Sequence, residues 1–400
     1  MPKTGRTAGK VLTGVRVEPF RGWRVAPERL RDLAGRYATP WGQLGDSWDG
    51  VAEETANVLR SWQRSGTLVR ENRPAVYAYE QTGPHGAQRG VLASVHLDSR
   101  LLPREDVIPE RAAAIARVMG TGRLNLDPLL LGYPGTGTVS AHLDAISLHR
   151  PIAEVLGSDG QRHRLWRITQ PAVHAEIADE LARVPALIAD GHHRWVAARQ
   201  LRRELHAAGD GPGPWDFVEA LLVDTRRSQI RISPVHRVLP FVDPWSAMDA
   251  ASRAFRVTRL HGDITEWLPT LRQTAGRTVA FAAVTELGAF LLTDPHEGLL
   301  ADALRCVPAG LHNLHVVVLH HALLGALWGV PDVPEEIHYE PSPSRAVRRV
   351  REQGGVAVLL APPRQEDLRG VLAAGLRLPR KSTAFGAGPH PGLVLRTFDD

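Results

Sequence analysis

Strand-like and helix-like runs alternate along the whole sequence, and this interleaving limits the folds open to the chain. Two strand-like runs, 74–81 (PAVYAYEQ) and 89–97 (RGVLASVHL), flank the glycine-bearing turn 82–88, a pattern typical of a β-hairpin. A helical pattern over 109–122 then ends at glycines suited to a C-cap, and the short apolar run 128–134 predicts a buried strand. Such antiparallel pairs among helices predict an α+β (mixed α/β) fold and argue against a doubly wound parallel sheet.

The length of the chain bears on its division into domains. Its 400 residues exceed what one hydrophobic core usually organises. We expect a loose tail over 1–14, an N-terminal α+β domain over 15–240, and a C-terminal α/β region over 241–400 that completes the fold. A hydrophobic content of 43% and a charged content of 23% are ordinary for a soluble globular protein.

Charge and cysteine content indicate the cellular compartment and the kinds of partner that the protein can bind. The net charge of +5 suits anionic ligands, but it is too diffuse to indicate nucleic-acid binding, and arginine usage also follows from a GC-rich genome. The single cysteine, Cys306, rules out a disulfide framework, and no apolar stretch follows the basic start, so we expect a cytoplasmic protein. Residues 311–330 approach the length of a membrane span, but histidines interrupt them, which favours a core helix over a membrane partner.

The strongest signal for a binding site is the run 186–200, ALIADGHHRWVAARQ, in which a strand leads into a helix. The first turn of a helix has backbone N–H groups without intrahelical partners and a positive dipole end, so it holds phosphate readily. Gly191 lets a ligand approach the backbone, and Arg194 can grip two oxygens. His192 and His193 can donate to an anion or move a proton, and Asp190 can cap, orient a histidine or bind Mg²⁺.

A purely structural interpretation competes with the binding site. In it, Asp190 is an N-cap residue and Arg194 pairs with it at i, i+4 on a solvated helix. The two interpretations differ in their forecast for Arg194→Ala. A phosphate-binding Arg194 implies an affinity loss of about tenfold to a hundredfold with little loss of stability, whereas the structural pair leaves binding untouched.

Several segments together carry a resemblance to one family. They are IADGHHRWVAA at 188–198, ISPVHRVLP at 232–240 and LPRKSTAFGAGPHPGLVL at 378–395, with the hairpin and the segment 105–133 in support. In these motifs the chain resembles the prokaryotic domain of unknown function family 1015 over nearly its whole length. The family implies no settled activity. Two of its motifs are altered here: 39–44 (TPWGQL) stands at its Tyr-Asp-Val, and Arg104-Glu105 replaces a His-Glu pair. If that pair is catalytic, the change implies altered specificity or reduced activity.

A more distant resemblance links the Asp-Gly-His-His-Arg element to the nucleotide-binding signature of the ParB/sulfiredoxin superfamily, and implies a ParB/sulfiredoxin-like core. Sulfinic acid reduction needs a cysteine in this turn, and here a histidine stands there. A partition protein needs a helix-turn-helix module and a basic DNA face, and neither is clear after residue 207. Small-molecule phosphotransfer needs a phosphate cradle, a metal-binding carboxylate and a base, for which the sequence has candidates.

These considerations assign candidate roles to residues. The catalytic candidates are Glu105, Asp190, His192 and His193, and Asp190 and Glu105 are the candidate Mg²⁺ ligands. We expect phosphate or nucleotide contacts from Gly191, Arg194, His236, Arg237, Lys381, Ser382 and Thr383, and substrate contacts from Glu80, Gln81 and Arg89. Each has a structural alternative, such as a solvated loop carboxylate for Glu105, a packed strand-end residue for His236 or a hairpin cap for Glu80. We predict that residues 190–194, Glu105 and His236 line one pocket.

Three functions follow from these candidates. The first is an ATP- or ADP-dependent phosphotransferase using Mg²⁺ and acting on a small hydroxylated metabolite, of which an amino acid is one example. The second is a nucleotide-binding regulatory protein without turnover. The third is a DNA-associated, partition-like module. The sequence does not identify the substrate, the nucleotide base or the oligomeric state.

Overall fold

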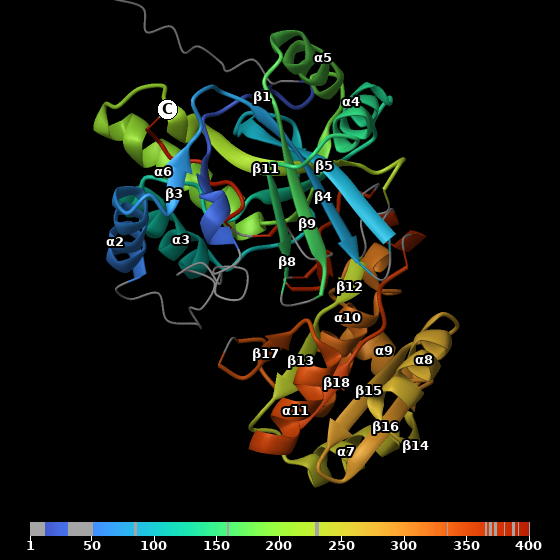
Figure 1. The fold of residues 1–400 in the computed structure, drawn as a ribbon. Helices are drawn as coiled ribbons and strands as arrows, with labels where there is room; N and C mark the ends of the chain where they lie inside the picture. Colours follow the sequence, from blue (N-terminus) through green and yellow to red (C-terminus); the bar gives the residue numbers. More distant parts are fainter. Residues whose placement is uncertain are drawn as a thin grey trace, which may run out of the picture. The chain divides into compact units, whose positions relative to one another are not determined.

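The computed structural model describes residues 13–30, 51–83, 86–157, 160–228, 232–333, 335–364, 366–367, 370–371, 374–379, 381–385, 389–390 and 392–399. It is a mixed α/β structure of two compact units (Figure 1). Unit 1 comprises 1–103, 107–230 and 387–400, and unit 2 comprises 104–106 and 231–386. The predicted division after residue 240 therefore differs from these units, because β13 (His236–Leu239) pairs within the second unit's sheet.

Unit 1 is built on a nine-stranded mixed sheet in the order β6-β10-β7-β11-β5-β4-β9-β8, with β1 also on β5. Its strands are β1 (Val17–Glu18), β4 (Val76–Gly83), β5 (Gly86–His96), β6 (Leu101–Leu102), β7 (Leu129–Tyr133), β8 (Ala153–Leu156), β9 (Arg162–Ile168), β10 (Ala186–Asp190) and β11 (Phe217–Asp224). The small pair β2 (Trp23–Val25) and β3 (Leu68–Arg70) lies outside this sheet. The predicted hairpin is confirmed as β4–β5, since the two strands pair from Tyr77 to Gly86.

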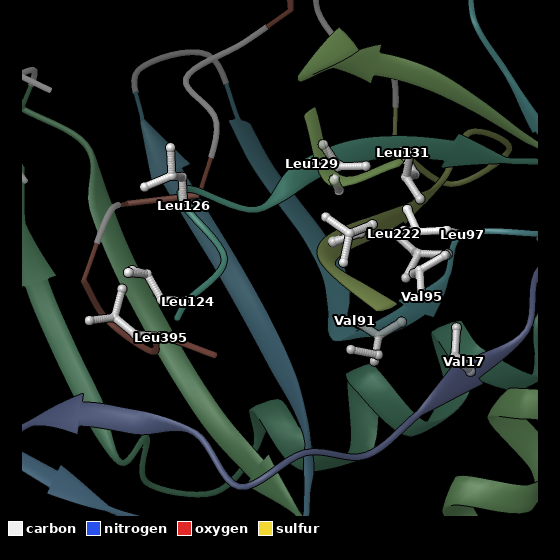
Figure 2. Packing of buried hydrophobic residues seen from close by; sticks show 14 of the residues in the cluster. Val17, Val91, Val95, Leu97, Leu124, Leu126, Leu129, Leu131, Leu222 and Leu395 are labelled. Carbon is white, nitrogen blue, oxygen red and sulfur yellow. The ribbon is translucent and has the colours of Figure 1, made fainter. Parts of the chain in front are cut away.

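Helices pack against the sheet of unit 1 and enclose its core. They are α2 (Val51–Arg64), α3 (Pro109–Gly122), α4 (Thr138–Ser147), α5 (Pro171–Leu181) and α6 (His192–Ala208), with the short 3-10 turns η1 (Pro27–Arg29) and η2 (Pro214–Asp216). Alternate residues along the central strands point into this core, which Figure 2 shows for Val91, Val95, Leu129, Leu131 and Leu222. The helix α3 packs on both α6 and α2, so the start of α6 is supported by buried neighbours.

Unit 2 contains a six-stranded antiparallel sheet in the order β14-β16-β15-β18-β13-β17. These strands are β13, β14 (Arg256–Leu260), β15 (Ala280–Thr285), β16 (Gly288–Thr293), β17 (His338–Glu340) and β18 (Val356–Leu359). A separate pair joins β12 (Ile232–Pro234) to β19 (Thr383–Phe385). The composition of 230–240 (IRISPVHRVLP) predicts one strand, but its described residues 232–239 are divided between these two sheets.

Helices cover both faces of the sheet in unit 2. They are α7 (Pro244–Ala254), α8 (Ile264–Ala275), α9 (Glu297–Ala303), α10 (His315–Val318) and α11 (Pro343–Gln353), with η3 (Ala309–Leu311) and the π-helical η4 (Leu319–Leu327). Phe281 and Ala283 of β15 pack with α7, α10 and η4, whereas Ala282 and Val284 pack with α8 and α11. The sheet is therefore the middle layer of three.

The apolar run 311–330 forms part of this core, as predicted from the histidines that interrupt it. Its helical residues 316–319 are buried. No helix in the described part of the chain combines the length and hydropathy that crossing a membrane requires.

The helix α3 spans the predicted residues 109–122, but its cap differs from the prediction. The C-cap residue is Arg123, with a left-handed φ of 50°, and Gly120 and Gly122 lie inside the helix. The composition of 392–398 (GLVLRTF) predicts a last strand, but this segment forms isolated bridges instead, from Leu395 to Trp23 and from Thr397 to Leu124.

Candidate functional site

The strand–glycine–helix element at 186–208 forms as predicted, with β10 running into α6. The ladder between β10 and β7 shifts register between Ile188 and Asp190, which indicates a bulge at the end of the strand. Gly191 then takes a left-handed φ of 95° as the N-cap of α6. A Cβ at this position would lie 2.6 Å from Leu129 Cδ2 and 3.3 Å from Arg194 Nε. Glycine is therefore required both by the backbone angle and by the space between Leu129 and the guanidinium.

Arg194 is held in place by three oxygen acceptors. Its Nη1 donates to the carbonyl oxygens of Asp127, at 2.6 Å, and Pro128, at 2.9 Å. Its Nη2 donates to Asp190 Oδ2 at 2.5 Å. The guanidinium therefore fastens the segment before β7 to the start of α6, and it lies against the backbone of Gly191 with 18% of its side chain exposed.

The two histidines of the motif differ in their surroundings. His193 Nε2 accepts a hydrogen bond from the backbone N–H of Ile108, at 2.9 Å. An accepting Nε2 carries no proton, so His193 has its proton on Nδ1 in this arrangement. Ile108 is the N-cap residue of α3, and its side chain makes no capping hydrogen bond. His193 thus provides an acceptor for the backbone N–H of this N-cap residue. His192 is buried, with 5% exposed.

A second strand–glycine–helix element follows β7, and the sequence analysis missed it. Gly135 and Gly137 lie in the loop before α4, and Gly137 has a φ of 112° as its N-cap. Here acidic side chains of the chain itself occupy the loop. The carboxylate of Glu180 accepts from Thr136 N, at 2.9 Å, and from Val139 N, at 3.1 Å.

Asp224 occupies the other side of this loop. Its Oδ1 accepts from Gly135 N at 3.0 Å, and its Oδ2 accepts from Ser140 Oγ at 3.0 Å. Burial acts to raise the pKa of Glu180, but the hydrogen bonds from Thr136, Val139 and Thr138 outweigh it, and the pKa lies below its usual value. The glycine spacing was the available signal, but the acidic residues that fill the loop lie about 40 and 90 residues later in the sequence, at Glu180 and Asp224.

The predicted substrate residues of the hairpin take part in contacts across strands. Glu80 is buried and pairs with Arg89 and, at 3.3 Å, with Arg164. Arg89 also donates to Asp144 Oδ1 at 2.8 Å. Desolvation lowers the pKa of Arg89, but the two carboxylates raise it by more. Gln81 points to the opposite face and donates to Gln161. Within unit 1 these residues join the sheet and α4 through ion pairs.

Glu105 and the Lys-Ser-Thr segment lie in unit 2. Arg104 donates to Glu105 Oε1 at 2.5 Å, and both side chains are buried. Glu105 forms a parallel bridge with Leu378, three residues before Lys381. The Oγ of Ser382 donates to the carbonyl oxygen of Pro379 at 2.5 Å. Thr383 begins β19, opposite Pro234. The backbone of unit 2 therefore brings Glu105 close to the segment 378–383.

His236 and Arg237 lie in β13, buried inside unit 2. His236 Nδ1 accepts from Leu360 N at 3.2 Å, and burial, followed by the charges of Arg237 and Arg272, lowers its pKa to about 3. The imidazole is therefore neutral at physiological pH. Arg237 is fully buried, donates to Val235 O and to His320 Nε2, and lies 4.8 Å from the ring centroid of Tyr339.

The candidates thus form two groups. Residues 190–194 lie together in unit 1, and Glu105, His236, Arg237 and 381–383 lie in unit 2. That both groups line one pocket stays a prediction. No group of three His, Cys, Asp or Glu side chains in the described ranges is arranged to hold a metal ion. A metal at Asp190 would therefore need further ligands from a phosphate or from water.

Comparison with known proteins identifies the family. A protein family described as a protein of unknown function, DUF1015, matches residues 38–312. That is more than half of the chain, and the protein belongs to this family. The family-specific stretch 39–44 noted above lies outside the described residues. A search of curated proteins finds no match.

Solved structures share only a remote similarity with this chain. A free serine kinase variant in complex with ADP has a TM-score of 0.39 and 13% identity, over 77% of this chain and 92% of that chain. A conserved hypothetical protein from Pyrococcus furiosus has the same TM-score and identity, over 77% and 96%. SbnI with a C-terminal truncation, from Staphylococcus aureus, has a TM-score of 0.38 and 12% identity, over 76% and 87%. Similarity at this level assigns neither a fold nor an activity to the chain.

Proposed function

We propose that the protein is a nucleotide-dependent phosphotransferase whose phosphate-binding element is the turn from Asp190 to Arg194. The observation that carries the proposal is the geometry of Gly191, at which a glycine backbone, a helix N-terminus and a fixed guanidinium meet. The likeness of this turn to the nucleotide-binding signature of the ParB/sulfiredoxin superfamily supports the proposal, and a core of that type is part of it.

The chemistry of the turn suits phosphate oxygens. The helix α6 is 17 residues long, so its N-terminal end has the positive potential of an extended row of peptide dipoles. Arg194 is already oriented by Asp190 and by two carbonyl groups, so a ligand that meets its exposed edge need not order it. Both features favour an anion bound at the start of the helix.

Asp190 suits a role beside a metal-bound phosphate. Its side chain is 53% exposed, whereas its partner Arg194 is mostly covered. Mg²⁺ in nucleotide sites commonly has one or two protein carboxylates and completes its shell with phosphate and water. With a nucleotide present, Mg²⁺ would neutralise charge on the phosphates, and Asp190 is the residue that would hold it.

Phosphoryl transfer to a hydroxylated metabolite also needs a base. The hydroxyl oxygen would form a bond to the terminal phosphorus of ATP or ADP, the bond to the leaving nucleotide oxygen would break, and the hydroxyl proton would pass to the base. Glu105 and His192 are the candidates. We propose a small hydroxylated metabolite as the acceptor, with amino acids such as serine as the first class to test.

Calorimetric titration of ATP and ADP, with and without Mg²⁺, tests the binding step. Asp190→Asn keeps the shape of the side chain and removes its charge, so we expect Mg²⁺-dependent affinity to fall about tenfold. The matched control is Asp210→Asn, an exposed carboxylate just beyond the other end of α6. Equal nucleotide affinity in wild type and Asp190→Asn, or no binding by the wild type, would contradict the proposal.

Turnover separates the phosphotransferase from a regulatory protein. Incubation with ATP or ADP and a panel of hydroxylated amino acids should give a phosphorylated product in wild type and less in Glu105→Gln. Nucleotide binding without any product would instead favour the regulatory alternative. Duplex DNA binding that weakens steeply with salt would favour the partition-like alternative.

A further inference from the structure

Unit 2 contains two adjoining cavities, and the larger one is lined by several basic side chains. The larger has a volume of about 430 Å³, within the range of small-molecule sites. Arg277, Arg305, Arg364, His312 and His315 contribute to its wall, with Asn313 beside them. A smaller cavity of about 30 Å³ adjoins it, shares Asn313, His315 and Arg364, and is also lined by Asp367, the partner of Arg364.

The charged side chains that the described residues contribute to the larger cavity are all arginines. Its wall, as far as the described residues form it, contains three arginines and two histidines but no carboxylate. Arg305 and Arg364 are paired with Asp302 and Asp367. Arg277 is exposed, and in the described part of the chain no carboxylate lies within ion-pair distance of it. A bound anion would therefore meet one uncompensated guanidinium and two that keep further N–H donors.

The histidines add directed hydrogen-bond groups. His312 Nε2 donates to the carbonyl oxygen of Val307 at 2.8 Å, which orients its ring. The ring of His315 packs edge-on against Phe281, with centroids 6.3 Å apart. Burial, followed by the charge of Arg364, lowers the pKa of His315, so it is a neutral donor and acceptor at physiological pH.

Apolar side chains also line the larger cavity. They are Val279, Leu300 and Leu304, and Leu304 is buried. A ligand that combines a charged group with an apolar body would match both kinds of lining residue. A dianionic phosphate group matches several guanidinium groups better than a single carboxylate does, because each guanidinium can reach two of its oxygens.

The Lys-Ser-Thr segment, for which the family resemblance implies phosphate contacts, reaches the smaller cavity. Ser382 lines this cavity together with Leu378. The hydroxyl of Ser382 donates to Pro379 O, which leaves its oxygen able to accept.

We propose that these cavities bind a small phosphate ester with a partly apolar body, through residues other than those at the start of α6. The proposal does not depend on phosphotransfer at α6, since all residues that carry it belong to unit 2. It implies a second ligand, such as a phosphorylated metabolite, beside the nucleotide.

Three probes test the chemistry with the full-length protein: phenol, inorganic phosphate and phenyl phosphate. Calorimetry should show no binding of phenol, weak binding of phosphate and tighter binding of phenyl phosphate. Arg277→Gln removes the guanidinium without leaving a charged partner behind, and it should weaken phenyl phosphate about tenfold. Arg253→Gln is the matched control, because Arg253 is exposed in the same unit and pairs with Asp249 on α7.

Hydrogen exchange locates the effect and separates the two sites. Phenyl phosphate should protect backbone amides at 275–279 and 300–315 in wild type and in Asp190→Asn. Protection confined to 187–196, or equal affinity of wild type and Arg277→Gln for phenyl phosphate, would overturn the proposal. Loss of ATP binding in Asp190→Asn, with phenyl phosphate binding retained, would show that the two proposals stand separately.

Discussion

Arg194 is the residue on which the binding and structural interpretations of the Asp-Gly-His-His-Arg element converge. Its pair with Asp190 at i, i+4 is present, as the structural interpretation expects. The two carbonyl groups that it also binds, at Asp127 and Pro128, lie 67 and 66 positions earlier in the chain. The same guanidinium therefore joins the start of α6 to the segment before β7.

The structure revises the prediction for Arg194→Ala. We still expect nucleotide affinity to fall about tenfold to a hundredfold, but stability should also fall by about 1–3 kcal/mol, because two carbonyl groups lose their donor. Arg194→Lys should recover only part of either loss, since one ammonium cannot reproduce the fork. Nucleotide titration and urea unfolding of each variant measure the two effects.

Arg203→Ala is the control for this prediction, because Arg203 is exposed on the same helix. It should change neither quantity. If Arg194→Ala loses stability but keeps the affinity of the wild type, then Arg194 serves only to fasten the segment before β7.

The sequence identified the residues of this turn but not their partners. Asp190, Gly191 and Arg194 are close along the chain, and the strand-to-helix transition follows from apolar spacing and from glycine. The acceptor at Pro128 and the donor at Ile108 are main-chain groups, which have no sequence signature. The sequence therefore does not reveal the structural role of His193, which accepts a hydrogen bond from Ile108 N.

At the scale of elements, the loop before α4 shows how a helix N-terminus can be filled from within the chain. Glu180 of α5 accepts from the loop of Gly135 and Gly137, while Asp224 at the end of β11 accepts from the other side. The turn at Gly191 differs, because its acid, Asp190, is paired with Arg194 and two histidines follow the glycine.

Glu180→Gln should destabilise unit 1 by about 1–3 kcal/mol at neutral pH, because hydrogen bonds to a charged acceptor are lost. The pKa of Glu180 in the folded protein lies below its ordinary value near 4.5. Its contribution is therefore present above about pH 4.5 and is lost as the pH falls through the lower, folded pKa. Urea unfolding at pH 7, 5, 4 and 3 should show wild type and variant converging at the acidic end.

Asp179→Asn provides the comparison, since Asp179 is the exposed neighbour of Glu180 on α5. Its stability should follow that of the wild type at every pH. A constant difference between wild type and Glu180→Gln from pH 7 to pH 3 would contradict an ionised, hydrogen-bonded Glu180.

Prediction of elements succeeded where a strand or helix is long and periodic, as for the hairpin β4–β5 and the helix α6. It failed where tertiary pairing decides the outcome. Residues 232–239 have one continuous β-like composition, but Val235 separates a strand that pairs with β19 from one that pairs with β17 and β18. Leu395 and Thr397 pair with Trp23 and Leu124, which lie far earlier in the sequence, and form isolated bridges instead of a strand.

At the scale of the whole molecule, the end of the chain returns to unit 1 and is fastened there by Arg396. This side chain is buried and donates to Asn125 Oδ1 and to Pro214 O, both at 2.8 Å. Its backbone N–H donates to Glu219 Oε2 at 3.1 Å. Segments from the middle and the end of the sequence thus meet around one buried carboxyl group, whose charge must matter to the stability of unit 1.

Burial raises the pKa of Glu219 to about 8, and the opposing influence of Arg396 does not compensate. This folded pKa lies above the ordinary value near 4.5. The contribution of Glu219 to stability is therefore greatest below about pH 4.5 and is lost as the pH rises toward 8. At about 1.4 kcal/mol for each pKa unit, the loss is on the order of 3–5 kcal/mol. Glu219→Gln cannot ionise, so its stability should fall less between pH 5 and pH 8 than that of the wild type.

Urea unfolding at pH 5, 6.5 and 8 measures this difference in slope, which is independent of any constant cost of the substitution. Glu18→Gln is the matched control, because both Glu18 and Glu219 pair with Ser94 in the strand register, but the side chain of Glu18 is 43% exposed. Its slope should equal that of the wild type. If Glu219→Gln also keeps the wild-type slope, then Glu219 does not change its charge between pH 5 and pH 8, and the end of the chain is held without a proton on this group.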